Sequence, residues 1–110
     1  MSSGKEYLVV FTTCAELSLA ERIANELVLN HLGACVQIIP GIKSYFRWEN
    51  RIDTAQENLL LIKTSADKYA EIEDRIKSLH GYEVPEIIAV PVTAGSGDYL
   101  AWINDNTRRL

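Results

Sequence analysis

Three features that the sequence lacks narrow its class before any motif is considered. No window approaches the roughly 18 consecutive apolar residues of a membrane-spanning helix, and the start, MSSGKEYLVVF, has neither the basic region nor the long apolar stretch of a secretory signal. Cysteine is scarce, with two residues in 110, which argues against a disulfide framework. We therefore expect a cytoplasmic chain with reduced thiols and no membrane contact.

The chain also lacks an excess of basic residues. Lys and Arg number 11 against 15 Asp and Glu, so the formal net charge is −4. A nucleic-acid partner is therefore not expected, whereas dispersed acids and two histidines leave room for cationic ligands. The apolar share of 47% and the charged share of 24% are ordinary for a globular protein. At this length we expect a single domain over residues 1–110.

The pattern of apolar residues predicts four strands and three helices. Strands are expected at residues 7–12, 34–49, 52–63 and 87–91. Helices are expected after the first strand, after the third strand and at the C-terminal end, the second with an apolar stripe of Tyr69, Ile72, Ile76 and Leu79. This β-α-β-β-α-β order is typical of an α+β ferredoxin-like plait, in which two helices cover one face of an antiparallel sheet of order 4-1-3-2.

Short motifs suggest where the helices begin and end. Thr13 with Glu16 fits a capping box for the first helix, and Gly33 suits its C-terminal cap. Thr64 is expected near the start of the second helix, and Asp98 is expected to cap the third.

The predicted hairpin of residues 34–63 is unusually long. A straight strand from 34 to 49 would extend roughly 50 Å, well beyond a compact domain with a radius of gyration near 13 Å. Pro40-Gly41 predicts a bulge that redirects the strand. An isolated two-stranded arm is marginally stable in water, so we expect neighbouring copies to cover it in an oligomer. The alternative is a hairpin that curls back onto its own sheet.

Chemistry-bearing residues gather at one end of the predicted sheet. Cys14 ends the first strand, His80 ends the second helix, and Glu83 and Glu86 precede the fourth strand, which lies beside the first. A thiolate, an imidazole and a carboxylate are ligands that suit copper or zinc. Cys35 starts the second strand at the opposite end, so no intrachain disulfide is expected.

Each of these residues also has a simpler interpretation. Cys14 and Cys35 are small enough to be buried hydrophobic residues, and His80 suits the negative end of a helix. Cys14 with His80 as base could act as a nucleophile, but no third orienting group is evident. The aromatic residues Tyr45, Phe46 and Trp48 are interpreted as interface core in preference to a ligand wall.

Several segments together resemble one known family. GACVQIIPGIKSYFRWEN, LLLIKT, YEVPEIIAVPV and GDYLAWI occur in the order found in the CutA family of divalent-cation tolerance proteins, and the likeness covers essentially the whole chain. The resemblance implies a ferredoxin-like subunit with an extended hairpin, a homotrimer joined through strands, and kinship with PII-type signalling trimers. It also implies a role in tolerance of copper and other divalent metals, and we expect no enzyme activity.

The resemblance also implies a set of metal ligands. His80, Cys35 and Glu57 match ligand positions of copper-binding members, whereas Thr12 stands where those members have a cysteine and Leu79 replaces a first histidine. Cys14, two residues beyond Thr12, is the candidate to take the place of that cysteine.

The sequence therefore predicts a cytoplasmic homotrimer that helps the cell tolerate divalent metals. It is expected to bind Cu²⁺ or a related divalent cation weakly at inter-subunit clefts, with no metal needed for folding. The candidate ligands are His80, Cys14, Cys35, Glu57 and Glu86. The alternative function is a PII-like regulatory or scaffold trimer that binds a small metabolite or a partner protein.

Overall fold

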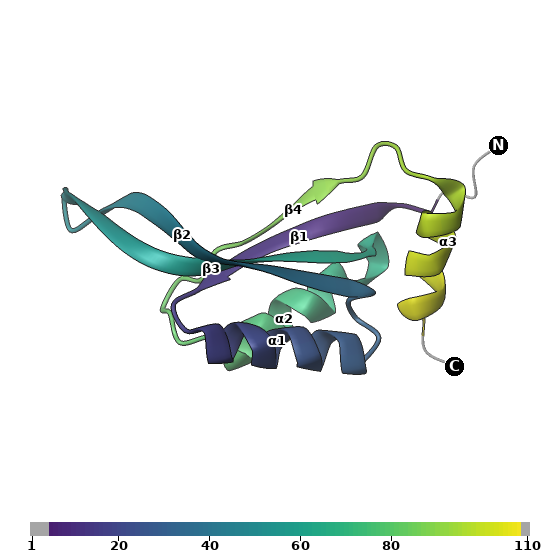
Figure 1. Cartoon of the computed structure of the whole chain (residues 1–110), viewed down its shortest axis with the longest axis horizontal. Coiled ribbons are helices and arrows are strands. Elements are labelled where there is room, and N and C mark those ends of the chain that lie inside the picture. The colour runs from purple at the N-terminus through teal and green to yellow at the C-terminus, as the bar shows by residue number, and fades with distance from the viewer. Residues whose placement is uncertain (1–4, 109–110) are drawn as a thin grey trace.

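The computed structural model describes residues 5–108 and contains the predicted elements in the predicted order (Figure 1). The strands are β1 (Tyr7–Cys14), β2 (Cys35–Trp48), β3 (Arg51–Ser65) and β4 (Ile87–Pro91). The helices are α1 (Leu17–Leu29), the 3-10 turn η1 (Ala66–Lys68), α2 (Tyr69–Leu79) and α3 (Gly97–Asn106).

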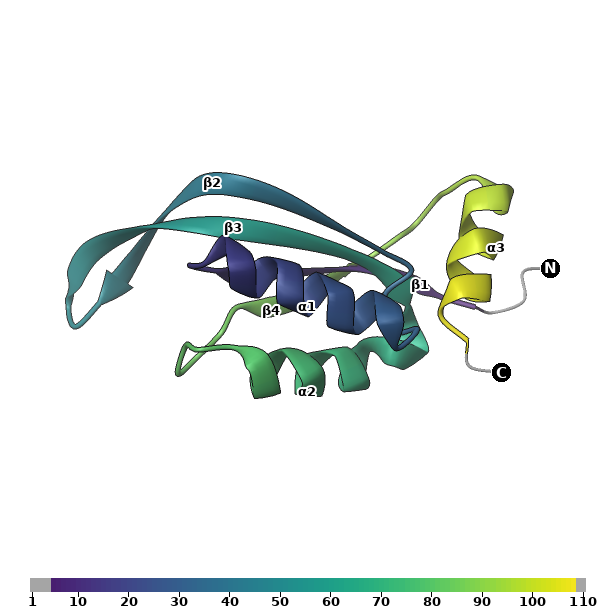
Figure 2. The same ribbon diagram turned by 60° about the horizontal axis from the view of Figure 1, so that its bottom comes forward.

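The four strands form one antiparallel sheet in the order β2-β3-β1-β4, which is the predicted 4-1-3-2 counted from the other edge. Helices α1 and α2 lie side by side under one face of this sheet, and α3 stands at the end away from the hairpin tip (Figures 1 and 2). The predicted α+β architecture is confirmed.

The core lies between the sheet and the two long helices. Alternate side chains of β1 and β3, including Val10, Leu60 and Ile62, are fully buried there. They pack against apolar residues of both helices, namely Ile23, Leu27, Ile72 and Ile76. Full burial of each such side chain contributes about 1.5–3 kcal/mol relative to exposure. The helices therefore close one face of the sheet and leave the other face open.

The hairpin projects past the helices. Its outer part, residues 42–57 beyond the Pro40-Gly41 interruption, is called the arm below and extends to the left in Figure 1. The molecule measures 50 × 26 × 22 Å, and the arm residues Tyr45 and Ile52 are 68% and 72% exposed. The arm is therefore not curled onto its own sheet.

Two local features shape the hairpin. The pairing shifts between Ile39 and Ile42, so that Pro40 and Gly41 form a bulge. Gly41 has φ +74°, a left-handed conformation that favours glycine. At the tip, Glu49 and Asn50 both have positive φ, which is the two-residue type I′ turn that suits twisted strands. The predicted bulge is confirmed.

Helix α1 ends in a Schellman motif whose left-handed residue is His31 (φ 59°), not Gly33. The Leu32 N–H donates to the Leu27 carbonyl oxygen at 2.9 Å, as this motif requires. Gly33 has a packing role, because a Cβ atom there would lie only 3.1 Å from Cγ2 of Ile62. The prediction that Gly33 caps α1 is therefore wrong, because His31 takes the left-handed position and Gly33 is required for packing against Ile62.

The other predicted caps also differ from the structure. Thr13 continues β1 opposite Leu59, and Glu16 is the N-cap of α1 without a side-chain capping bond. Thr64 belongs to β3, where its hydroxyl donates to the Leu32 carbonyl at 2.6 Å. Helix α3 is capped by Ser96, whose Oγ accepts the Tyr99 N–H at 3.1 Å. A tertiary hydrogen bond holds Thr64 in β3, whereas α3 is capped locally, by Ser96 in place of Asp98.

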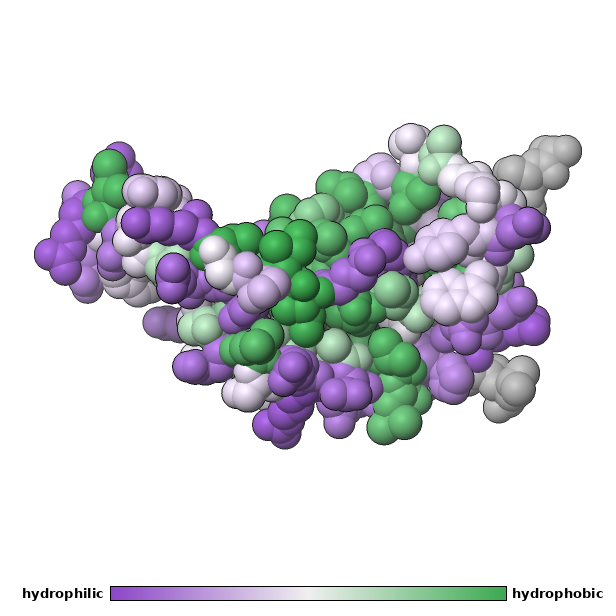
Figure 3. Space-filling view, viewed as in Figure 1, coloured by the Kyte–Doolittle hydropathy of each residue, from purple (hydrophilic) through white to green (hydrophobic). Residues whose placement is uncertain are grey.

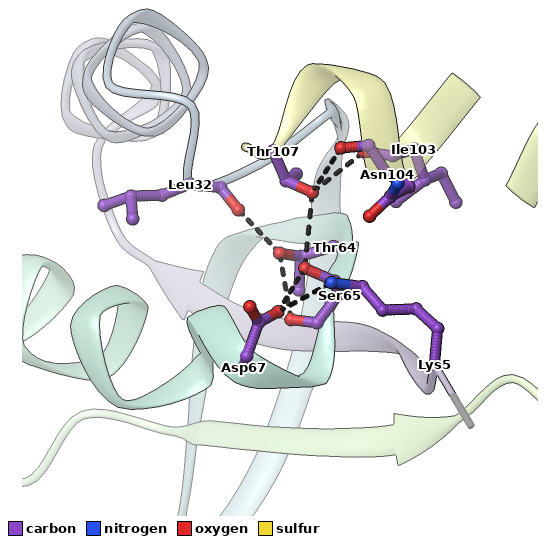
Figure 4. A network of polar contacts seen from close by, with 8 residues as sticks. All are labelled: Lys5, Leu32, Thr64, Ser65, Asp67, Ile103, Asn104 and Thr107. Carbon is purple, nitrogen blue, oxygen red and sulfur yellow. Dashed lines mark hydrogen bonds and ion pairs between the residues drawn. The ribbon is translucent and has the colours of Figure 1, made fainter. Parts of the chain in front are cut away.

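A polar network attaches α3 to the end of β3 (Figure 4). Thr107, which follows α3, is buried, and its hydroxyl donates to the Ile103 carbonyl and lies 3.3 Å from Oγ of Ser65. Ser65 in turn donates to Asp67 at 2.6 Å, and Asp67 lies 3.5 Å from the Lys5 ammonium. The network holds the C-terminal helix against the sheet.

Candidate ligand-binding cleft

The sheet face away from α1 and α2 carries exposed apolar side chains. Ile39, Ile88 and Val90 are each more than two-fifths exposed. The register places Phe11 between Leu61 and Ile88 on this face. A broad hydrophobic surface runs across the middle of the molecule between the arm and α3 (Figure 3). An apolar patch of this kind marks an interaction surface.

A cleft of about 730 Å³ opens beneath the arm, where the open face ends. Three walls meet there: the arm, the end of β1, and the loop before β4. The lining residues are Thr13, Ser44, Tyr45, Phe46, Trp48, Asp53, Ala55, Glu57, Tyr82, Val84 and Glu86. The β2–β3 register explains the arm wall, because it sets Phe46 opposite Asp53 and Ser44 opposite Ala55.

Glu57 is a buried carboxylate on this cleft. It is 8% exposed, and its two oxygens accept hydrogen bonds from Ser44 Oγ at 2.8 Å and from Tyr82 Oη at 2.9 Å. Burial, followed by the bond to Glu57 and that group's negative charge, raises the pKa of Tyr82 to about 12. The phenol therefore stays protonated and positions the carboxylate.

His80 is fixed by hydrogen bonds at both ring nitrogens. Nε2 lies 2.6 Å from the Thr13 carbonyl oxygen and must donate to it, while Nδ1 accepts the Tyr82 N–H at 3.0 Å. The ring also contacts that of Tyr82, with centroids 4.7 Å apart. His80 thus ties α2, β1 and the following loop together, and a metal ion could bind either nitrogen only by displacing one of these bonds.

Cys14 is a fully buried thiol in the helix-side core. Its Sγ lies 3.5 Å from the Glu16 carbonyl oxygen, to which the thiol donates. Burial raises the pKa of Cys14, and the charges of Glu57 and Glu16 raise it further. A raised pKa and full burial are typical of a structural thiol, not of a nucleophile.

The remaining predicted ligands lie apart. Cys35 of β2 pairs with Lys63 of β3, whereas Cys14 of β1 pairs with Asn58 of β3. Their partners lie five residues apart on β3, so the two cysteines are separated by about 17 Å along the strand direction. Both cysteines are free. Glu86 is exposed on the cleft wall with Glu57. Within residues 5–108, no three Cys, His, Asp or Glu side chains come close enough together to hold a metal ion.

The structure therefore brings together only part of the predicted set. Glu57 and Glu86 share the cleft, with His80 and Cys14 behind it. Sequence reasoning missed Tyr82 as the group that holds Glu57. The only sequence signal for Tyr82 is its place two residues after His80, in the loop that the topology brings beside the end of β1.

An antiparallel sheet of this order with both long helices on one face defines a small α+β protein of the ferredoxin-like class. The sequence matches the family model of the CutA1 divalent ion tolerance protein over residues 8–106. The chain belongs to this family.

Known proteins similar to this chain support that assignment. The Thermus thermophilus divalent-cation tolerance protein CutA is 42% identical over 99 residues, which cover 90% of this chain and 96% of that protein. A chloroplastic CutA of Arabidopsis thaliana is 39% identical over 92% of this chain, which spans 56% of that protein. The solved structure of a periplasmic CutA from Archaeoglobus fulgidus has a TM-score of 0.90 at 39% identity and covers 93% of this chain and 99% of its own.

The names of these relatives place them in more than one compartment. Within residues 5–108 of this chain, no helix is long and apolar enough to cross a membrane.

Proposed function

We propose that this protein is a non-enzymatic homotrimer of the cytoplasm that supports tolerance of excess divalent cations by binding Cu²⁺ or a related ion weakly at clefts between subunits. The observation that carries the proposal is the buried carboxylate of Glu57, which faces a cleft at the rim of an uncovered apolar sheet face. Family membership supports the role in cation tolerance.

The trimer is supported by the surfaces that a single chain leaves exposed. The open face presents Ile39, Ile88 and Val90, and the arm presents Tyr45 and Trp48, which are 68% and 51% exposed. Apolar strands of this kind are covered in stable proteins. Sister copies packed on this face would place each cleft beside a neighbour.

The donor groups explain why binding would be weak. Glu57 and Glu86 offer oxygen atoms directly to the cleft. His80 offers a nitrogen only after it gives up a hydrogen bond, and Cys14 offers a thiolate only against a raised pKa. Cys35 could join this set only from another copy, because it lies at the far end of its own sheet.

Titration calorimetry with Cu²⁺ and Zn²⁺, paired with native mass measurements, tests the metal site. Glu57→Gln and His80→Asn should each weaken binding about tenfold, the scale on which even outer-shell groups act. His31→Asn is the matched control, because His31 is exposed on the α1 side and away from the cleft. Unchanged binding in both cleft variants would overturn the proposed site.

A second candidate function is a PII-like regulatory or scaffold trimer. The size of the cleft favours it, because about 730 Å³ lies within the range of about 300–1,000 Å³ that small-molecule sites occupy. A metabolite that stays bound to the native trimer after chelation of all metal would favour this function over metal binding.

A further inference from the structure

The arm joins the rest of the chain at a point where the backbone is free to bend. The pairing of β2 and β3 shifts at the Pro40-Gly41 bulge, and the arm beyond it projects past the helices (Figure 1). Gly41 has φ +74°, and a Cβ atom there would have nothing within 4 Å. A few residues of this kind are enough to act as a hinge. The direction of the arm must therefore be set by contacts beyond the bulge.

One carboxylate makes such contacts at the base of the arm. Glu57 of β3 pairs with Ile42 just beyond the bulge and is 8% exposed. It accepts hydrogen bonds from Ser44 Oγ of β2 at 2.8 Å and from Tyr82 Oη at 2.9 Å. Tyr82 lies in the loop between α2 and β4. Within residues 5–108, no ion pair and no other side-chain hydrogen bond joins the arm to the rest of the chain.

The loop side of this connection is itself fixed. The Tyr82 N–H donates to Nδ1 of His80 at 3.0 Å, and the two rings are in contact with centroids 4.7 Å apart. Nε2 of His80 donates in turn to the Thr13 carbonyl oxygen of β1 at 2.6 Å. The phenol hydroxyl is therefore held from the body of the molecule. Ser44, Glu57 and Tyr82 are called the clamp below.

We propose that the clamp fixes the direction of the arm in the free chain and thereby prepares it for assembly, an inference that rests on the proposed trimer. The clamp bonds form within one chain around a buried carboxylate, so they need no open cleft and are compatible with sister copies that cover the arm. An arm already held in its assembled direction loses less conformational freedom on association. Ser44 and Tyr82 are thus positioning residues that act through Glu57.

A distance measurement within one chain tests the first part of the proposal. Spin labels are placed on the arm by Arg51→Cys and on α1 by Arg22→Cys, both exposed positions. Cys35→Ser removes the accessible native thiol, and Cys14 is fully buried. The full-length chain also carries Ile88→Lys, which is expected to keep copies apart. Pulsed electron resonance should then give one narrow distance distribution.

Variants of the clamp should broaden that distribution. Tyr82→Phe and Ser44→Ala each remove one donor to Glu57, whereas Ser44→Thr keeps the hydroxyl and should keep the distribution narrow. Tyr69→Phe is the matched control, because it removes a hydroxyl bonded to Glu73 at the same 2.9 Å on α2. Distributions that stay narrow in both clamp variants, or that broaden equally in the control, would overturn the proposal.

Sedimentation over a dilution series, without Ile88→Lys and without labels, tests the link to assembly. Tyr82→Phe and Ser44→Ala should each raise the concentration at which the copies dissociate about tenfold, because association must then order a loosened arm. Tyr69→Phe and Ser44→Thr should leave it unchanged. Broadened distances with unchanged dissociation would overturn the role in assembly.

The two measurements separate the failure of the clamp from that of the proposed trimer. A single folded chain for the unaltered protein would remove the trimer, and broadening of the arm distance in the clamp variants would still support the clamp. A trimer whose clamp variants keep both a narrow distance and an unchanged dissociation would remove the clamp and leave the proposed function standing.

Discussion

At the scale of single residues, Thr12 is a polar residue that is fully buried in the core. Its hydroxyl oxygen Oγ1 has no hydrogen-bond partner within the described part of the chain. An unpaired buried hydroxyl costs about 1–3 kcal/mol.

Replacing this hydroxyl should therefore stabilise the protein. Thr12→Val is expected to raise the free energy of unfolding by about 1 kcal/mol, because valine has the same shape without the unpaired group. The control is Thr64→Val, which removes the 2.6 Å bond to the Leu32 carbonyl and should destabilise. Urea unfolding at fixed protein concentration measures both, and equal effects would contradict the account.

The raised pKa of Tyr82 predicts how the stability of the fold depends on pH. Its pKa is raised from 10.0 to about 12, first by burial and then by Glu57. Because the folded-state pKa lies above that of the unfolded chain, the resulting stability is fully present below pH 10 and is lost as the pH rises through about 12.

Ultraviolet titration of tyrosine ionisation measures this shift. One tyrosine per chain should ionise near pH 12, and Glu57→Gln should move it toward its ordinary pKa because a negative neighbour is removed. The pKa of Tyr69 is also raised, by burial and by Glu73. The variant Tyr82→Phe is therefore needed to identify which transition belongs to Tyr82. A transition unaffected by Glu57→Gln would show that burial alone acts.

At the scale of elements, the bulge in β2 sets the direction of the arm. Gly41 has φ +74° and open space around it, and Gly81 also has open space but no positive φ. Gly41→Ala should lower the free energy of unfolding by about 1 kcal/mol through backbone strain alone. Gly81→Ala should be neutral or slightly stabilising. Thermal unfolding compares the two, and similar results would show that the bulge does not need glycine.

Element order could be predicted from the sequence because it depends on apolar periodicity, as the stripe of Ile72 and Ile76 shows. Element ends could not, because distant groups decide them. Strand β1 continues through Cys14, whose carbonyl accepts the Asn58 side-chain amide at 3.2 Å. Gly33 suggested a helix cap, but its small size is needed for contact with Ile62.

The same limit applies to the cleft. Glu86 was expected at this end of the sheet and lines the cleft there, together with Glu57, which only the resemblance had indicated as a ligand. The hydrogen bonds that occupy both His80 nitrogens could not be anticipated, because one partner is the carbonyl of Thr13, which is 67 residues away in the sequence. Sequence patterns predict which side chains lie near one another, but not which of their donors and acceptors already take part in hydrogen bonds.

At the scale of the whole molecule, the uncovered sheet face is the surface through which copies are expected to assemble. Ile88 is 55% exposed on β4 of this face, whereas Leu29 is 76% exposed at the end of α1 on the helix side. If copies assemble through the open face, a charge at Ile88 should dissociate them and a charge at Leu29 should not, because only the first would be buried unpaired.

Sedimentation equilibrium of the full-length chain, alone and as Ile88→Lys and Leu29→Lys, tests this claim most directly. The unaltered protein and Leu29→Lys should have a mass three times the 12.4 kDa of one chain, and Ile88→Lys should sediment as a smaller species. A folded, cooperative single chain at micromolar concentration in the unaltered protein would contradict it.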